Sequence, residues 1–361
     1  MKRRTYLKSA AVTAAGITGL SGCIATKSSG SNGSNLSGTL RVATYSPFVN
    51  APSSAPGPVL KKEFEKQYPN ATLEWKTPDS GINYYIQRRM QGADLGADVY
   101  VGLNTDHLIR IDDKLGGKQL FASVGTDQVP NASHVKGSLE FDPKNRAIPY
   151  DTGYISLVYD ATSIEAPTTF DDLLKSKYKG KLLAENAQND ATGKAFLLWT
   201  IHQKGADGYL DYWKQLVDND VRILGTWDDA YTSYSNGEAP MVVSYSTDQV
   251  YAHKSNQSLQ KHSIGFLDDQ AYANPEGMAK FADTGQSKLA DAFLNFMLSK
   301  QAQAKLAVLN VQFPATDWAD PGEEFSKYAK APKNPVTFSY DRLKGNVDGW
   351  VNAWAQQIAA K

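Results

Sequence analysis

The 361-residue sequence has a single cysteine, Cys23. The chain that follows it therefore has no disulfide framework, no thiolate metal cluster and no cysteine nucleophile. Long apolar runs are missing as well. The apolar stretch from Ala10 to Leu20 is shorter than the ~20 residues that span a membrane and is interrupted by Thr and Gly, so a short transmembrane anchor is the weaker reading of it.

Neither sign of charge dominates, because 38 Lys and Arg balance 38 Asp and Glu. No global field attracts nucleic acid or anionic lipid, and we expect no nucleic-acid partner. The five histidines show no i, i+4 pairing, and neither a Gly-rich phosphate loop nor a Gly-x-Ser-x-Gly turn is present. We expect no enzyme activity and no cofactor. A metal site of scattered His and Tyr stays open as an alternative, although a lone His is more often structural.

The first residues have the pattern of an export signal. Lys2, Arg3 and Arg4 form a positive segment ahead of the weakly apolar stretch. The Arg3-Arg4 pair resembles a twin-arginine signal, and Leu20 to Cys23 resembles a lipobox. Residues 1–23 are thus predicted to be a lipoprotein signal. Lipid on Cys23 would anchor the protein to the outer face of the cell membrane, in a periplasm or at the cell surface.

Residues 24–37 are rich in Ser, Gly and Asn and predict a flexible tether. About 320 residues follow, more than one compact core usually holds, so two lobes are expected. Strand-type runs alternate with segments of helical period, which predicts an α/β fold in which each lobe is a mixed, mostly parallel sheet flanked by helices. The lobe boundaries are placed at 38–150 with 281–361 for lobe 1, and at 151–280 for lobe 2.

The predicted elements fall into two series and a C-terminal group. The first series has strands at 39–44, 71–75 and 98–101 and helices at 59–67 and 82–91. The second has strands at 155–159, 180–184, 221–224 and 241–244 and helices at 192–203, 209–217 and 228–235. Amphipathic helices at 290–298, 301–306 and 341–359 are expected to pack back on lobe 1.

Aromatic residues stand where predicted strands end. Tyr45 follows the first strand, Trp227 opens a helix after a strand, and Tyr245 ends another strand. These positions would line a cleft between the lobes. Aromatic walls with a few carboxylates suit a flat cationic heterocycle, since a ring face attracts a desolvated cation by ~0.5–2 kcal/mol. Simple core packing is the alternative for any single ring, because the chain has 7 Trp and 19 Tyr.

From residue 38 to 358 the chain resembles the thiamine-binding proteins of ABC importers, which have the type II periplasmic-binding fold. The resemblance rests on the order and spacing of short segments, no one of which is diagnostic. They are residues 44–48, 56–62, 81–92, 97–103, 149–154, 193–199, 227–231, 237–238 and 244–247 with Tyr251. It implies that this chain captures thiamine between two lobes and delivers it to the membrane permease subunits of the transporter.

The resemblance also implies a set of ligand-binding residues: Tyr45, Ser80, Gly81, Asp190, Ala191, Trp227, Tyr245, Ser246, Thr247, Asp248 and Tyr251. Trp227 and the tyrosines would stack on the thiamine rings, Asp190 or Asp248 would balance the positive charge, and backbone groups near Gly81 would bind the amine. No metal site is implied.

Three departures from the family concern the site. Ser54 and Val311 stand where better-known members have Trp, and Asp190 replaces a small hydroxyl residue. A carboxylate at position 190 would favour a free cation and repel a phosphorylated one. We therefore predict tighter binding of thiamine than of its phosphates.

Alternatives remain on the same fold. Ferric-ion binders use neighbouring tyrosines, but the adjacent pair Tyr84-Tyr85 lies in a predicted helix, where successive side chains point about 100° apart. Thiamine-degrading enzymes attack with a cysteine, which this chain lacks beyond Cys23. A different small cation or sulfur-containing ligand is a third possibility, because pockets are rebuilt on unchanged folds.

Overall fold

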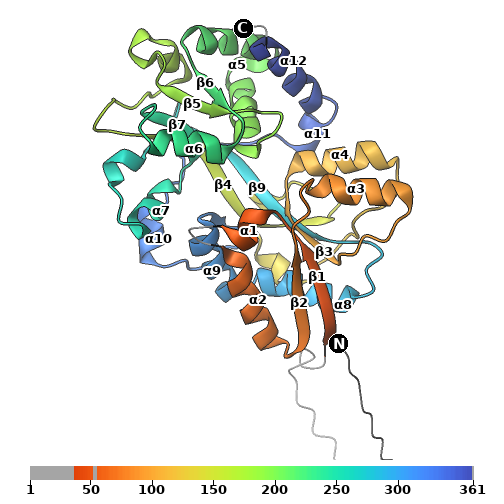
Figure 1. Ribbon diagram of the computed structural model, residues 1–361. Helices are drawn as coiled ribbons and strands as arrows, with labels where there is room; N and C mark the ends of the chain where they lie inside the picture. Colours follow the sequence, from red (N-terminus) through yellow and green to blue (C-terminus); the bar gives the residue numbers. More distant parts are fainter. Residues whose placement is uncertain (1–35, 52–54, 360–361) are drawn as a thin grey trace, which may run out of the picture. The chain divides into compact units, whose positions relative to one another are not determined.

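The computed structural model describes residues 36–51 and 55–359 (Figure 1). The predicted signal, the lipid site Cys23 and residues 24–35 of the predicted tether lie outside the described residues, as does Ser54. The last residue assigned to the tether, Ser37, is instead the first residue of a strand. The described residues belong to one compact unit.

The strands form a single sheet, whose main path runs in the order β2-β1-β3-β9-β4-β7-β5-β6. Its strands are β1 (Ser37–Ala43), β2 (Asn70–Lys76), β3 (Val99–Leu103), β4 (Ala147–Tyr159), β5 (Leu182–Glu185), β6 (Arg222–Leu224), β7 (Met241–Tyr245) and β9 (Gln270–Lys280). Short strands β8 (Ser263–Gly265) and β10 (Phe313–Pro314) pair with β4, and β11 (Asn334–Val336) pairs with β9. The trio β2-β1-β3 is parallel, and so is β7-β5-β6.

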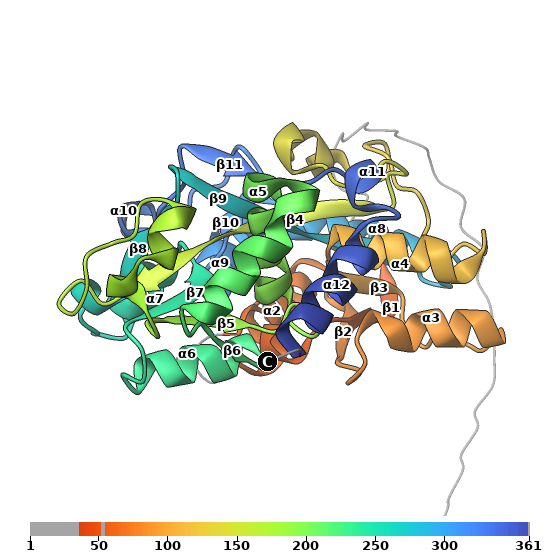
Figure 2. The same cartoon turned by 90° about the horizontal axis from the view of Figure 1, so that it is seen from above.

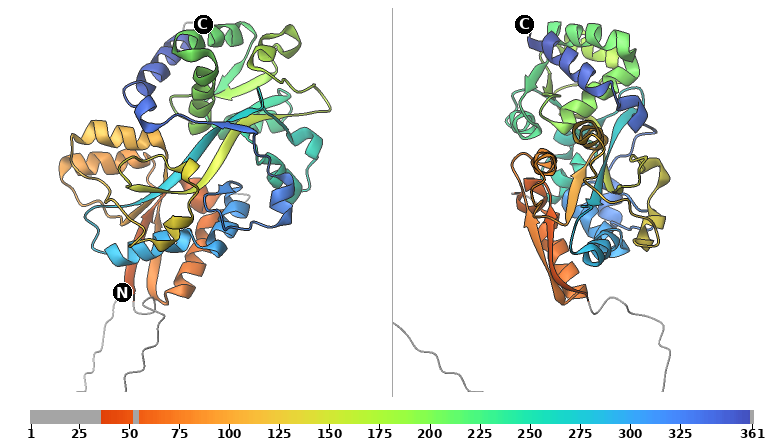
Figure 3. Two further views of the ribbon diagram at one scale, coloured as in Figure 1. Left: turned by 180° about the vertical axis from the view of Figure 1, so that it is seen from behind. Right: turned by 90° about the vertical axis from the view of Figure 1, so that its right-hand side faces the viewer.

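Helices cover both parts of the sheet (Figure 3). Those around β1 to β3 are α1 (Ser46–Asn50), α2 (Pro56–Gln67), α3 (Ile82–Gln91), α4 (Thr105–Leu115), α8 (Ser287–Met297) and α9 (Lys300–Asn310). Those around β5 to β7 are α5 (Ala191–Asp218), α6 (Trp227–Ser235) and α7 (Asp248–Lys254). Three more follow or flank them: α10 (Glu323–Tyr328), α11 (Tyr340–Leu343) and α12 (Val347–Ala359). Among the described residues, no helix combines the length and apolarity that crossing a membrane requires.

The long strands β4 and β9 join the two parts of the sheet (Figures 1 and 3). They pair antiparallel with each other, from Ala147 with Ala279 to Ile155 with Tyr272. The C-terminal end of β9 also pairs with β3, whereas the C-terminal end of β4 pairs with β7. The middle of this ribbon therefore belongs to both parts of the sheet. The predicted strands and helices of both series are present, and the α/β two-lobed architecture is confirmed. The exact lobe boundaries remain a proposal.

Helix α5 contains both helices that were predicted at 192–203 and 209–217. They meet at Gly205, whose φ of 75° interrupts the helical backbone, so the chain kinks there. The N-terminus of α5 is capped by Asp190, whose Oδ1 accepts hydrogen bonds from the backbone N–H groups of Thr192 and Gly193. This cap fixes where the helix begins.

The last helix does not pack where the sequence predicts. α12 lies along α5 (Figure 2), where Trp354 meets Trp213 edge to face at 5.3 Å between ring centroids. The Tyr209 hydroxyl donates to the Trp350 carbonyl at 3.2 Å. The expectation that residues 341–359 return to lobe 1 is therefore wrong for this helix. The Trp354 indole packs on an apolar face of α5, and periodicity alone does not identify the partner of an amphipathic helix.

Candidate ligand-binding site

The aromatic part of the site is built at the start of α6 and the end of β7. The Trp227 ring stacks on Tyr231 with centroids 4.9 Å apart and meets Tyr245 edge to face at 6.3 Å. The indole Nε1–H donates to Ser244 Oγ at 3.0 Å, which fixes the ring against the end of β7. Trp227 and Tyr245 are both half-buried. The ring faces of Trp227 and Tyr245 are thus partly accessible to a ligand, while their polar atoms are held by hydrogen bonds.

Asp190 connects this aromatic group to α5. One carboxylate oxygen caps the helix, and the other accepts from the Trp227 backbone N–H at 2.9 Å. Thr192, two residues on, donates from Oγ1 to the Tyr245 hydroxyl at 3.3 Å. The predicted residues Asp190, Trp227 and Tyr245 are therefore brought together. Ala191 stands beside them as the exposed first residue of α5.

Tyr45 approaches from the other part of the sheet. Its hydroxyl donates to Glu276 Oε2 at 3.2 Å and lies 3.4 Å from Asn310 Oδ1. Tyr150 donates to the same Glu276 oxygen at 2.5 Å. Asn310 in turn donates from Nδ2 to Asp151 Oδ2 at 2.7 Å. Asp151 and Glu276 are register partners across β4 and β9, at the middle of the ribbon that both parts of the sheet share.

Burial and mutual repulsion dominate the electrostatics of these groups. Burial, followed by the charge of Glu276, raises the pKa of Asp151 well above its usual value, against the hydrogen bond from Asn310. Burial also raises the pKa of Glu276, although the hydrogen bonds from Tyr150 and Tyr45 oppose it. Burial and then Glu276 raise the pKa of Tyr245, which keeps its hydroxyl neutral.

Gly81 is placed near this group by way of Tyr100. A Cβ on Gly81 would lie 3.5 Å from the Tyr100 hydroxyl, whose pKa is raised by burial, by Tyr85 and by Glu276. Gly81 has a φ of 53° and precedes α3, so its left-handed backbone turns the chain into that helix. Its neighbour Ser80 is exposed.

The segment after Tyr245 is buried, and its acidic residue is hydrogen-bonded within the protein. The Asp248 carboxylate is buried and accepts from the Tyr231 hydroxyl at 2.5 Å and from His262 Nδ1 at 2.7 Å. Each carboxylate oxygen of Asp248 thus has a hydrogen-bond partner within the protein, and its role toward a ligand stays a prediction. Ser246 and Thr247 are buried as well, and Tyr251 reaches the group only through an edge contact with Tyr231 at 6.4 Å.

Sequence reasoning missed the carboxylates of the shared ribbon. Tyr150 and Asp151 belong to the matched segment 149–154 and to a predicted crossover between the lobes but have no predicted contact with the ligand, and Glu276 and Asn310 are absent from the prediction. A signal was present, since an acidic residue within an apolar strand needs a special partner when it is buried. The strand β9 itself was not predicted, so Glu276 had no place in the site.

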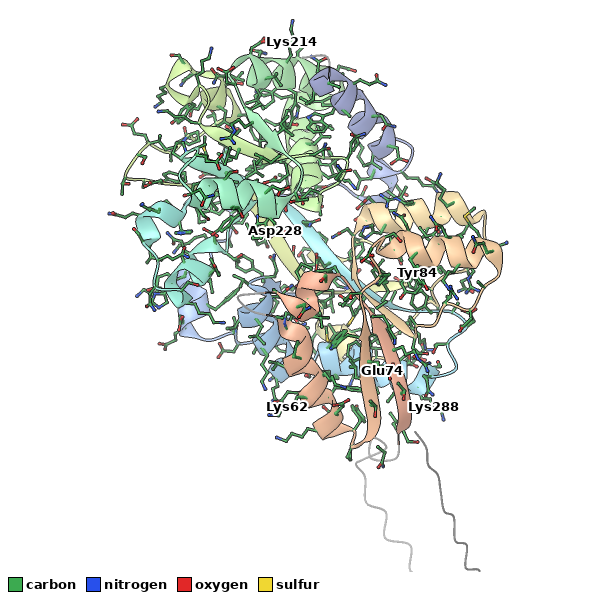
Figure 4. The ribbon with its side chains drawn as sticks, viewed as in Figure 1. Lys62, Glu74, Tyr84, Lys214, Asp228 and Lys288 are labelled. Carbon is green, nitrogen blue, oxygen red and sulfur yellow. The ribbon has the colours of Figure 1, made fainter. Side chains whose placement is uncertain are left out.

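The described residues contain no group of three or more His, Cys, Asp or Glu side chains arranged to hold a metal ion. Tyr84, labelled in Figure 4, is exposed on α3, whereas Tyr85 is buried in the core against Phe281. The two rings stand at 86° to each other. They therefore face different surroundings, as the helical spacing predicts.

Two of the cavities in the described part of the chain can be compared with the predicted site. One of about 430 Å³ lies beside α7 and β8 and has none of the predicted residues in its lining. The other, of about 30 Å³, lies between α4, α5 and β9, and Ala191 and Lys194 are among its lining residues. Lys194 pairs there with Asp106 of α4 at 2.7 Å.

Comparison with known proteins places this chain in a family. Residues 96–342 match the family described as bacterial extracellular solute-binding protein. The chain is 27% identical to the thiamine-binding periplasmic protein of Salmonella typhimurium over 321 residues, covering 89% of this chain and 93% of that protein.

Solved structures agree. A periplasmic thiamin binding protein superposes with a TM-score of 0.75 at 26% identity, covering 90% of this chain and 98% of that one. The ferric binding protein of Campylobacter jejuni has a TM-score of 0.69 at 17% identity, covering 88% and 99%, and shares the fold alone. The chain belongs to the bacterial extracellular solute-binding protein family.

Proposed function

We propose that this chain is the substrate-capturing subunit of an ABC importer and that thiamine is its ligand. The observation that carries the proposal is the pairing of half-buried aromatic rings with two carboxylates that no cationic side chain of the described residues contacts. Trp227 and Tyr245 stand on one side, and Tyr45 stands beside Glu276 on the other. A flat aromatic cation satisfies both features, since it stacks on rings and supplies the missing positive charge.

The relatives named thiamine-binding support this ligand, because they align along nearly the whole chain. In the proposed mode the rings of thiamine lie against Trp227, Tyr245 and Tyr45, and Glu276 faces the positive charge. The lobes close on the ligand by bending at β4 and β9, which join them. The permease subunits then recognise the closed form.

The N-terminal pattern completes the proposal. Residues 1–23 export the protein and Cys23 carries lipid, so that the binding domain works outside the cell while anchored to the membrane. A binding role, rather than an enzymatic one, fits the sequence after Cys23, which contains no further cysteine for thiamine chemistry.

Isothermal titration calorimetry of the purified protein tests the ligand directly. We expect thiamine to bind and Fe(III) to give neither heat of binding nor a visible tyrosinate band. Chromatography after incubation should recover thiamine intact. A charge-transfer band with Fe(III), or consumption of thiamine, would instead favour the ferric or the enzymatic alternative.

The variant Trp227→Ala tests the site. We expect a loss of thiamine affinity of at least ~10-fold, because truncating an aromatic hot spot in a binding site typically costs ~2 kcal/mol or more. Trp318→Ala is the matched control, since that indole packs on His134 and donates to the Leu298 carbonyl, away from the cluster. Equal affinities of Trp227→Ala and the parent protein would remove Trp227 from the site.

A further inference from the structure

Two acidic side chains face each other where the two parts of the sheet join. Asp151 of β4 and Glu276 of β9 are direct register partners in an antiparallel pair. Side chains in such positions point to the same face of the sheet, with Cβ atoms roughly 4.5–5.5 Å apart. Asp151 is fully buried, whereas Glu276 keeps partial exposure. The pair thus has an inner and an outer member.

The neighbours of this pair donate hydrogen bonds but bring no positive charge. Glu276 accepts from Tyr45 and Tyr150, and Asp151 Oδ2 accepts from Asn310. Asp151 Oδ1 has no hydrogen-bond partner. Within the part of the chain that the structure describes, no Lys, Arg or His side chain pairs with either carboxylate. Two buried like charges without a counter-charge are unfavourable, and sharing one proton relieves the repulsion.

The other titratable groups around the pair are hydroxyls. They come from the residue before α1 and from β3, β4 and β7, and they are Tyr45, Tyr100, Tyr150 and Tyr245. Burial raises the pKa of each, so all four are neutral near pH 7. Asp190 of α5 acts on Tyr245 and adds negative charge. Nothing in these surroundings replaces a positively charged ligand.

Building on the proposed function, we propose that Asp151 and Glu276 select the charge of the ligand by sharing one proton that a bound cation displaces into solvent. No bond of the ligand is made or broken: the protonated pair and the cation become the ionised pair with the cation bound, and the proton goes to buffer. Glu276, the partly exposed member, faces the ligand. Asp151 holds the proton behind it.

This arrangement favours a positively charged ligand over an uncharged one, which stacking alone does not do. An uncharged ring system stacks on the same aromatic faces but leaves the proton in place. A cation gains the attraction of two carboxylates, one of which is ionised only when the cation is present. Affinity for a cation should therefore rise with pH until the pair of the empty site is fully ionised.

Calorimetry of the full chain in buffers of different ionisation enthalpy measures the released proton. With thiamine at pH 7 to 8 in phosphate and in Tris, the observed enthalpies should differ by an amount equal to release of a substantial fraction of a proton, at most one per ligand. The neutral pyrimidine alcohol fragment of thiamine should bind weakly and give the same enthalpy in both buffers. This measurement needs no substitution, so it stands even if a variant fails to fold.

Variants divide the roles of the two residues. Asp151→Asn should abolish proton release and keep thiamine affinity within a few fold, because Glu276 stays ionised on its own. Glu276→Gln should abolish release and lower affinity at least 10-fold. Glu185→Gln is the matched control: Glu185 is another fully buried carboxyl without hydrogen-bond partners, and it touches neither residue, so release should persist.

The outcomes separate this inference from the proposed function. Failure of the wild-type protein to bind thiamine would overturn both. Thiamine binding with equal enthalpies in the two buffers, or proton release that survives in both Asp151→Asn and Glu276→Gln, would overturn the inference and leave the proposed function standing.

Discussion

Two glycines let tyrosine rings of the site lie directly on the backbone. A Cβ on Gly102 would stand 2.7 Å from a ring carbon of Tyr45, and a Cβ on Gly153 would stand 2.6 Å from two ring carbons of Tyr245. Contacts below 3.0 Å force something to move. The two rings therefore owe their positions to glycine, one in each part of the sheet.

Gly153→Ala should disturb the site while leaving the fold intact. The new methyl meets the Tyr245 ring and the Gln312 side chain, so we expect a loss of thiamine affinity of roughly 10-fold and of stability of about 1–3 kcal/mol. Calorimetry and urea unfolding measure the two effects. Gly349→Ala in α12, where the Cβ meets nothing within 4 Å, is the control and should be neutral or slightly stabilising. Unchanged affinity of Gly153→Ala would show that the Tyr245 ring position is not needed.

Among individual residues, the sequence predicted the aromatic side chains of the site better than its acidic side chains. Tyr45, Trp227 and Tyr245 are recognisable because an aromatic side chain at a strand end stands out. The family resemblance implies that Asp248 binds the ligand, and its carboxylate is also hydrogen-bonded to Tyr231 and His262, 17 and 14 residues away. Whether an acidic side chain has hydrogen-bond partners depends on residues elsewhere in the sequence. The spacing of residues around the acid does not reveal those partners.

Among the helices, α5 presents its N-terminus to the aromatic group. Such a terminus attracts anions, since its first N–H groups lack partners within the helix. Here the Asp190 carboxylate occupies that place: it accepts from Thr192 N and Gly193 N and also from Trp227 N. A phosphate on the ligand would have to displace this charge or lie beside it. The helix end is thus closed to anions by its own cap.

Asp190→Ser should shift the preference of the site toward phosphorylated ligands. Serine retains the capping hydrogen bond but removes the negative charge. We expect affinity for thiamine monophosphate to rise relative to thiamine by about 10-fold, as measured by calorimetry of both ligands. Asp190→Ala is the control, because it removes charge and cap together and should also cost about 1–2 kcal/mol of stability. A monophosphate that binds the parent protein as tightly as thiamine would contradict the argument.

Elements with a clean period were predicted well, whereas β9, which carries Glu276 of the site, was not predicted. The ends of α3 match the prediction because its period is regular and Gly92, with a φ of 68°, stops it. β9 was missed because Asn274, Pro275 and Glu276 interrupt its apolar pattern. These residues serve the interlobe ribbon, so local rules fail where the site is. In α9 the C-cap Val311 adopts a φ of 53°, which a β-branched residue rarely does, beside the site residue Asn310.

In the molecule as a whole, acidic residues with two different kinds of surroundings lie where the two parts of the sheet join. Lys194 of α5 and Asp106 of α4 pair across it at 2.7 Å. Burial alone would raise the pKa of Asp106, but Lys194, His107 and Arg110 together hold it well below its usual value. Asp151 and Glu276 have the opposite sign of shift, because no cation faces them. Ionised Asp106 therefore stabilises the fold, whereas ionisation of Asp151 and Glu276 reduces its stability.

Stability measured against pH should separate these two groups. A raised pKa means that folded Asp151 holds more protons than the unfolded chain, so its contribution falls as pH rises above the unfolded value of about 3.9. Without ligand, Asp151→Asn should therefore match the parent protein near pH 4 and exceed it by about 1–2 kcal/mol at pH 8. Urea unfolding at several pH values checks this.

Asp106→Asn should show the opposite dependence of stability on pH. The lowered pKa of Asp106 contributes stability above the unfolded value, and this contribution is lost as pH falls through the lower folded value. The variant should be less stable than the parent protein by about 1–3 kcal/mol at pH 7, with the difference shrinking below pH 4. The prediction would be contradicted if the stability difference from the parent protein changed with pH in the same direction for Asp106→Asn and for Asp151→Asn.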